Sequence, residues 1–264
     1  MKDTTLTAEQ RDLFEDRGLV RIEGAVPRPV AEGMADSLWR ELTRKHGAHR
    51  RDPATWRKER PADFKALAKS GVFKPMASPA VRGVLDDLLG PGQWDQPPTW
   101  GLPIVCFPSQ TRWGVPHKSW HLDLPANPRQ HALLVGRLFV ILAPLRAQGG
   151  GTLVATGSHR IVQRLATRAG EQQSSSAIRK RLQNEHRWFA DLMAPDRDRR
   201  RTERYMKGPT QVGGVPLRVE EMTGEPGDVY LMHPAALHAA APNVLTEPRL
   251  VLTQFVMPKG YLGP

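Results

Sequence analysis

Apolar residues in the first ninety positions recur at helical spacing. Thr7, followed three positions later by Gln10, has the pattern of a capping box, which predicts the start of a helix, and Gly18 predicts its end. Further on, apolar residues recur every fourth position and define one face of a longer helix: Val30, Met34, Leu38 and Leu42. We also expect a short strand at 19–22, a polar loop at 47–62, and short helices at about 64–69 and 79–89.

From about residue 99 the pattern changes to that of strands. Glycine and proline cluster between residues 90 and 98 and indicate a linker. Strands are then expected at about 99–107, 132–143, 151–155, 216–222, 227–232, 236–241 and 249–257, with loops rich in glycine and proline between them. One long helical stretch, Ser176–Met193, interrupts the series and precedes a charged run from Asp196 to Arg204. Helices followed by a series of strands predict a β core with helices packed outside it.

The length of 264 residues is ordinary for one β-rich domain. We therefore expect a single domain over 1–264, with a helical flank over 1–90 and a β core over 99–258. Residues 174–209 would be inserted into this core as a helical, basic lid. The single cysteine, Cys106, excludes an intrachain disulfide. No apolar run reaches the roughly 18 residues that span a membrane, and the first residues do not resemble a signal peptide, so we expect a cytoplasmic protein.

The positive charge changes this picture only slightly. Lysine and arginine exceed aspartate and glutamate by 38 to 27, a formal net charge of +11. The excess gathers at residues 40–60 and 179–207, but neither segment interleaves aromatic residues as a single-strand nucleic-acid platform does. Solvated helix faces explain this pattern better than a nucleic-acid footprint. Attraction of an anionic or carrier-linked substrate is a further reading.

A possible metal site begins at His121-Leu122-Asp123. Residues two apart in a strand point to the same side, so the imidazole and the carboxylate would project together. His238, among small apolar residues, supplies a third ligand, and His233 is a rival for that place. Two histidines and one carboxylate form the facial triad of non-haem Fe(II) oxygenases, which leaves positions open for an oxo-acid and dioxygen.

Arg249 opens a strongly apolar strand that ends near residue 257. A guanidinium that points into a barrel needs an anion, because an unpaired buried charge is costly. A dicarboxylate cosubstrate would supply one, since arginine holds a carboxylate by two parallel hydrogen bonds.

Together with Arg249, these pieces resemble the phytanoyl-CoA dioxygenase-like family of Fe(II)/2-oxoglutarate-dependent oxygenases. The matching segments are Trp120-His121-Leu122-Asp123, the run from Gly150 to Arg160, the run from Gly227 to Pro234, Leu237-His238 and Pro242-Asn243. The opening from Leu6 to Val20 is also similar. One departure is Thr156, where the family usually has proline before Gly-Ser-His.

This resemblance implies a mainly β fold with flanking helices, in which a double-stranded β-helix, or jelly roll, carries the metal at its mouth. It implies His121, Asp123 and His238 as iron ligands and Arg249 as the partner of the far 2-oxoglutarate carboxylate. Related halogenases have a small residue at the place of Asp123, so the carboxylate here indicates hydroxylation or another oxidation. The expected cofactors are Fe(II), 2-oxoglutarate and O2.

Other residues are assigned to the same site with alternatives left open. Arg137 interrupts an apolar strand, and it either reaches solvent or points inward to hold the near carboxylate of 2-oxoglutarate or a substrate anion. Thr152 could donate to the cosubstrate. Trp113, His117 and Trp120 flank the first ligands and are candidates for contact with substrate, although Trp120 also suits packing and His117 an exposed loop.

We therefore expect a dioxygenase that hydroxylates a small organic molecule, with decarboxylation of 2-oxoglutarate to succinate and CO2. A role in tailoring secondary metabolites is expected from the same resemblance. The alternatives are a basic jelly roll that binds an anion or nucleic acid with a vestigial metal site, and a hydrolase or isomerase that uses another metal. The sequence does not name the substrate or the oligomeric state.

Overall fold

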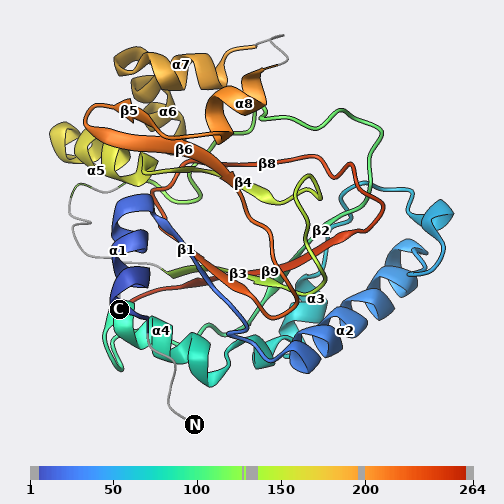
Figure 1. Ribbon diagram of the computed structural model, residues 1–264. Helices are drawn as coiled ribbons and strands as arrows, with labels where there is room; N and C mark the ends of the chain where they lie inside the picture. The colour runs from blue at the N-terminus through green and yellow to red at the C-terminus, as the bar shows by residue number, and fades with distance from the viewer. Residues whose placement is uncertain (1–5, 127, 129–135, 196–199, 260–264) are drawn as a thin grey trace.

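Two antiparallel sheets face each other and form the centre of the molecule (Figure 1). The computed structural model describes residues 6–126, 128, 136–195 and 200–259. The larger sheet has the order β1 (Leu19–Ile22), β7 (Val229–Met232), β3 (Gly136–Ile141), β9 (Arg249–Val256) and β2 (Leu102–Cys106). The smaller sheet has the order β5 (Thr210–Val212), β6 (Val215–Glu221), β4 (Thr152–Thr156) and β8 (His238–Ala240). Apart from the hairpin of β5 and β6, neighbouring strands are distant in sequence, and the fold is the double-stranded β-helix that the sequence predicts.

Helices cover the outer faces of both sheets (Figure 1). The larger sheet carries the N-terminal helices α2 (Arg28–His46), α3 (Lys65–Lys69) and α4 (Pro79–Leu89), with 3₁₀ turns at Pro53–Thr55 and Lys74–Met76. The smaller sheet carries α5 (Ser158–Ala169), α6 (Ser175–Glu185), α7 (Arg187–Met193) and α8 (Arg201–Met206). Helix α1 (Ala8–Arg17) packs beside β1 and α5. Among the described residues no helix is long and apolar enough to cross a membrane.

Strand alternation divides the apolar residues into three layers. On β3 and β9, Leu138 and Leu252 pack outward against the N-terminal helices. Phe139 and Val251, one position away on each strand, pack inward between the two sheets. A third layer lies between the smaller sheet and α5–α8. Because side chains two apart share a face, the odd-numbered residues of β3 and β9 line the barrel interior.

The N-terminal predictions from sequence are confirmed. The hydroxyl of Thr7 accepts a hydrogen bond from the backbone of Gln10, and the Gln10 side chain accepts one from Thr7, which completes the capping box. Gly18 ends α1 in the left-handed conformation, with φ of 67°. The apolar face predicted for the second helix is buried at Met34, Leu38 and Leu42.

The C-terminal half differs from the prediction in four places. We expected no helix at 158–169, and this is wrong, because Ile161, Val162, Leu165 and Ala166 form the buried face of α5. The expected helix 176–193 is broken at His186, whose extended backbone separates α6 from α7. The short helix α8 begins within the charged run and was not predicted. Strand β5 was not predicted either. Residues 132–135 of one expected strand lie outside the described residues.

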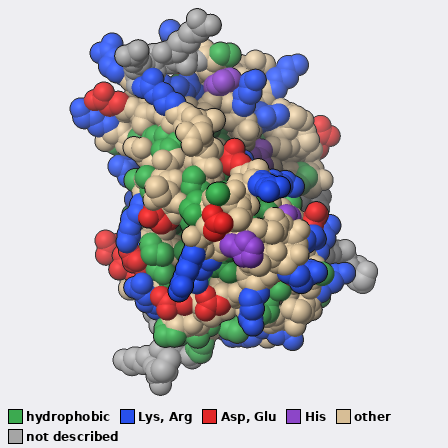
Figure 2. All heavy atoms as spheres, turned by 90° about the vertical axis from the view of Figure 1, so that its right-hand side faces the viewer, with side chains coloured by type: hydrophobic (Ala, Val, Ile, Leu, Met, Phe, Trp, Pro, Cys, Tyr) green, Lys and Arg blue, Asp and Glu red, His purple; other side chains and the backbone are tan. Residues whose placement is uncertain are grey.

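Basic side chains on the surface are largely interspersed with acidic ones. Figure 2 shows one face on which lysine and arginine lie scattered among acidic and neutral groups. On the helices several arginines form ion pairs, including Arg44 with Glu41 and Arg181 with Glu185. This arrangement favours solvated helix faces as the explanation of the net charge.

Two buried histidines tie the start of the chain to the barrel. The rings of His159 and His233 lie 4.7 Å apart between centroids. The imidazole of His159 donates from Nε2 to the carbonyl of Glu15 at 2.9 Å, and Nδ1 of His233 accepts from the backbone of Ala235 at 3.0 Å. Burial lowers the pKa of His159 to about 4 and holds the pKa of His233 well below its usual range. Both rings are therefore neutral in the fold at pH 7.

This pair predicts a loss of stability in mild acid. The unfolded chain takes up a proton on each ring near pH 6.5, whereas folded His159 does so only near 4, so the free energy of unfolding falls as the pH drops through this window. For His159 alone the loss is about 2 kcal/mol by pH 4.5. Thermal melts from pH 7 to 4.5 should show a shallower decline for His159→Gln than for the unsubstituted protein. Parallel pH profiles would contradict the assignment.

Candidate active site

Three side chains of metal-binding type converge at one end of the barrel. His238 opens β8 opposite Val154, a residue of the inner layer, and His121 pairs with His238 in an isolated bridge. One ligand atom each of His121, Asp123 and His238 lies within 4.8 Å of the other two. Among the described residues this is the one group of three such side chains that meets. The side chains of His121 and Asp123 meet as expected, although Asp123 lies in a bend rather than a strand, and His233 lies elsewhere.

The two imidazoles are oriented by backbone carbonyls. Nδ1 of His121 donates to the carbonyl of Ser119 at 2.8 Å, and Nδ1 of His238 donates to that of Ala236 at 3.0 Å. In the neutral rings this leaves the Nε2 lone pairs free, and both point at Asp123, at 3.6 Å from His121 and 3.1 Å from His238. Lone pairs that face a carboxylate at this distance are stabilised by a cation between them. The donor set therefore fits a metal ion.

The charge of Asp123 is stabilised in the absence of metal. Burial raises the pKa of its carboxyl, but its contacts with His121 and His238 and the charge of Arg137 outweigh this and place the pKa well below its usual range. The same contact with Asp123 raises the pKa of His121. A carboxylate that is ionised at neutral pH is ready to act as a ligand.

The helices inserted after β4 hold the segment that carries His121. The backbone N–H of Leu122, between the two ligands, donates to Ser175 Oγ at 2.9 Å, and Arg179 donates to the carbonyl of Trp120 at 3.1 Å. Arg201 in α8 donates to the carbonyls of Val115 and Pro116. The inserted helices thus position the metal-binding segment, a role that the sequence did not indicate.

A buried guanidinium lies further inside the barrel. Arg249 is 4% exposed, donates to the carbonyl of Gly150 at 2.7 Å and to Thr152 Oγ1 at 2.8 Å, and leaves Nε without a partner. No carboxylate of the described residues forms an ion pair with it. Burial lowers its pKa to about 10, so it stays charged at neutral pH. This environment suits an anionic ligand that would complete the pairing.

Arg137 points into the barrel and reaches the candidate metal site. One of its terminal nitrogens lies 3.2 Å from Asp123 Oδ2, and its guanidinium lies 4.0 Å from the centre of the Phe255 ring. Its exposure is 9%, which excludes the solvent-facing alternative left open by the sequence. Burial lowers its pKa, and Asp123 opposes that effect.

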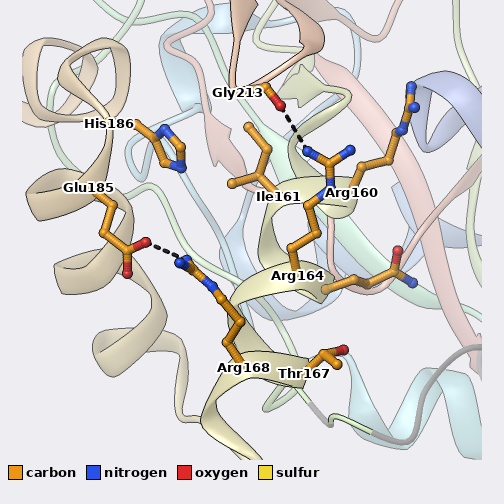
Figure 3. Close-up of a pocket in the computed structure, with 9 residues that line it drawn as sticks. Arg160, Ile161, Arg164, Thr167, Arg168, Glu185, His186 and Gly213 are labelled. Atoms are coloured by element: carbon orange, nitrogen blue, oxygen red, sulfur yellow. Dashed lines mark hydrogen bonds and ion pairs between the residues drawn. The ribbon is translucent and has the colours of Figure 1, made fainter.

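Two cavities differ in their relation to this site. One, called the inner cavity below, has a volume of about 400 Å³ and is lined by Arg137, Thr253 and Phe255 on the strands and by Lys65 and Lys69 on α3. The other, of about 750 Å³, lies outside the barrel between α5 and the end of α6 (Figure 3). In that outer cavity Arg168 pairs with Glu185 and Arg164 donates to the carbonyl of Gly213 at 2.8 Å. Neither cavity is lined by any of the three candidate ligands, but the first is lined by Arg137, which contacts Asp123.

A comparison with protein families decides the class of the chain. The model of the family described as phytanoyl-CoA dioxygenase (PhyH) matches residues 14–251, nearly the whole sequence. The chain belongs to the phytanoyl-CoA dioxygenase family. No curated protein matches its sequence.

Solved structures share the fold of this phytanoyl-CoA dioxygenase family member. HygX from Streptomyces hygroscopicus, with nickel and 2-oxoglutarate bound, is 18% identical with a TM-score of 0.55, over 97% of this chain and 88% of HygX. The carbocyclase SnoK from nogalamycin biosynthesis is 16% identical with a TM-score of 0.57, over 96% and 84% of the two chains. EctD from S. alaskensis, with 2-oxoglutarate and 5-hydroxyectoine, is 16% identical with a TM-score of 0.59, over 98% and 78%.

The three residues expected to contact substrate occupy different environments in this family member. Trp120 is 1% exposed and its indole donates to the carbonyl of Pro116 at 2.8 Å, as the packing alternative predicts. Trp113 is half-buried against the outer layer, and His117 is half-buried in the loop before the ligands. A substrate contact of Trp113 or His117 stays a prediction.

Thr253 and Phe255, which line the inner cavity, were not predicted as site residues from the sequence, because a threonine and a phenylalanine in a strand carry no functional signal of their own.

The contact between Leu122 and Ser175 predicts that α6 tunes metal affinity in this phytanoyl-CoA dioxygenase family chain. Ser175→Ala removes the acceptor for the backbone between the two ligands and should weaken nickel(II) binding by about tenfold. Isothermal titration calorimetry measures the change. Ser176→Ala is the matched control, because Ser176 bonds to Ser174 on the surface and should bind nickel as before. Equal affinities for the two variants would contradict this coupling.

Proposed function

We propose that this protein is an Fe(II)- and 2-oxoglutarate-dependent dioxygenase that hydroxylates a small organic molecule. The observation that carries the proposal is the pairing of two sites in one barrel. Two imidazoles and one carboxylate converge with their lone pairs, and a buried arginine without a carboxylate partner lies on the same interior surface. Membership of the phytanoyl-CoA dioxygenase family supports the same chemistry.

In this proposal His121, Asp123 and His238 hold the iron. Bound there, iron would supply the activation of dioxygen coupled to conversion of 2-oxoglutarate to succinate and CO2. Three protein ligands leave three positions free, enough for a bidentate oxo-acid and dioxygen. Because Asp123 fills the third ligand position, a halide would have no place on the metal, which supports hydroxylation over halogenation.

Arg249 would bind the far carboxylate of 2-oxoglutarate. Its free Nε and its charge suit the second carboxylate of the oxo-acid, while Gly150 and Thr152 hold the guanidinium in place. Thr152 therefore acts by orienting Arg249. The surrounding apolar side chains, such as Val251 and Val154, exclude water from the anchored cosubstrate.

The structural neighbours support a general class of biological role and do not identify a substrate. HygX binds nickel and 2-oxoglutarate, EctD binds 2-oxoglutarate and 5-hydroxyectoine, and SnoK is a carbocyclase from nogalamycin biosynthesis. We propose that this chain likewise tailors a small metabolite, free or carrier-linked, in the cytoplasm, with residues 174–209 over the entrance. A nucleic-acid-binding role finds no support in the mixed surface charge, and it gives Arg249 no task.

Anaerobic titration with Fe(II) and then 2-oxoglutarate tests the proposal. The wild-type protein should develop the weak visible charge-transfer band of the iron–oxo-acid chelate. His121→Ala should abolish the band, because one of three protein ligands is lost. Arg249→Ala should weaken 2-oxoglutarate binding by at least about 30-fold, because truncating one partner of a buried charged pair costs 2 kcal/mol or more.

Arg164→Ala serves as the matched control, since Arg164 lies in the outer cavity and touches neither site. It should titrate as wild type does. Folded wild-type protein that binds Fe(II) but forms no band with 2-oxoglutarate would reject the dioxygenase assignment. A band of equal strength in the Arg249 variant would reject the role of that residue alone.

A further inference from the structure

Two residues that line the inner cavity carry buried polar atoms without partners. Arg137 is 9% exposed, and its Nε has no hydrogen-bond partner among the described residues. Thr253 is 6% exposed, and its hydroxyl has none either. Both side chains line the same cavity of about 400 Å³. Buried polar groups are normally satisfied, so two unsatisfied donors on residues that line one cavity indicate a ligand that supplies the missing acceptors.

The geometry of Arg137 indicates which group would bind. One terminal nitrogen is engaged by Asp123 at 3.2 Å, and the ring of Phe255 lies against the guanidinium. The edge formed by Nε and the second terminal nitrogen remains for a ligand. Two parallel N–H groups on this edge match the two oxygens of a carboxylate. The Thr253 hydroxyl can donate a further hydrogen bond.

This location is distinct from the place proposed for 2-oxoglutarate. Arg137 pairs in register with Phe255, which lies six residues beyond Arg249 on β9, roughly 20 Å along the strand. The cavity is lined by Arg137 and Thr253 but by neither Arg249 nor Thr152. The near carboxylate of the cosubstrate would bind at the metal, and the cavity is lined by none of the three candidate ligands. Of the two readings that the sequence leaves open for Arg137, the cavity therefore favours a substrate anion.

The walls and rim add to this picture. Lys65 and Lys69 on α3 are exposed at the edge of the cavity and add positive charge at its opening. Leu102 is 47% exposed and borders the same space, and it is the one large exposed apolar side chain among the described residues. With Phe255 it offers an apolar surface beside the cations. The volume lies within the range of small-molecule sites.

We propose that this cavity is the substrate site and that it takes a small amphipathic carboxylate, with Arg137 as the residue that selects the anion. This inference rests on the proposed dioxygenase function. The carboxylate binds the free edge of Arg137 and Thr253, and the apolar body lies against Phe255 and Leu102. Arg137 lines this cavity and also contacts Asp123, so it connects the cavity to the candidate metal site. A phosphate monoester offers similar oxygens and is distinguished by experiment.

Binding of fluorinated probes by ¹⁹F NMR tests the proposal. The protein is loaded with zinc(II), which does not react with dioxygen, and with saturating 2-oxoglutarate so that Arg249 is occupied. The probes are 4-fluorophenylacetate, its neutral amide, and 4-fluorophenyl phosphate. Wild-type protein should bind the acid at least tenfold more tightly than the amide and more tightly than the phosphate.

Variants separate charge recognition from a structural effect. Arg137→Gln should lose the preference for acid over amide, whereas Arg137→Lys, which keeps a cation, should retain part of it. Arg164→Gln in the outer cavity is the matched control and should bind all three probes as wild type does. A structural role of Arg137 alone would weaken acid and amide together in both variants.

The outcomes separate this inference from the proposed function. Absence of saturable acid binding, equal binding of acid and amide, or an acid preference that survives Arg137→Gln would overturn the carboxylate site. Tighter binding of the phosphate would overturn the choice of carboxylate. Failure of the dioxygenase assignment is read separately, from the iron and 2-oxoglutarate titration of wild-type protein, which does not depend on these probes.

Discussion

Charged side chains buried between two apolar sheets are the constraint on which the rest of the structure depends. The interior surface of β3 and β9 carries Arg137 and Arg249, although most of the neighbouring interior side chains are apolar. Burial of an unpaired charge is costly, so each guanidinium needs oxygen partners from other segments. Arg249 obtains a carbonyl and a hydroxyl from β4 and the turn before it, and Arg137 obtains the carboxylate of Asp123. Both arginines retain a donor without a partner, which is the property expected of a barrel that receives anions.

The candidate ligands are held by parts of the chain far from them in sequence. His121 is fixed to β8 by paired backbone hydrogen bonds with His238, at 2.9 and 3.1 Å. The segment between the ligands is held by α6, and the segment before them by α8. Ser119, two residues before the first ligand, has a positive φ of 68°, a strained conformation that the surrounding contacts maintain. The metal site is therefore a product of both sheets and the inserted helices together.

The distribution of charge separates surface from interior. On the outside, arginines are mostly matched by acidic neighbours one helical turn away or on an adjacent segment, as with Arg28 and Glu32 or Arg50 and Asp36. Such exposed pairs contribute little to stability and much to solvation. Inside the barrel the cations outnumber the carboxylates that pair with them. The high net charge is thus a surface property, whereas the proposed binding of anions depends on two buried residues.

The sequence by itself determined the helical first third, most strands, the three candidate ligands and Arg249. These features depend on short spacings: a capping box, a four-residue apolar repeat, and a His-x-Asp whose side chains share one face of an extended segment. Helix α5 was missed because its buried residues lie beside a family motif read as a loop, and the break at His186 depends on a backbone bend without a sequence signal. Only the tertiary structure decided that Arg137 points inward, that Thr253 and Phe255 share its cavity, and that Ser175 supports the ligand segment. Each of these contacts joins residues separated by more than fifty positions or aligned by strand register, and such pairings are set by packing of the whole barrel.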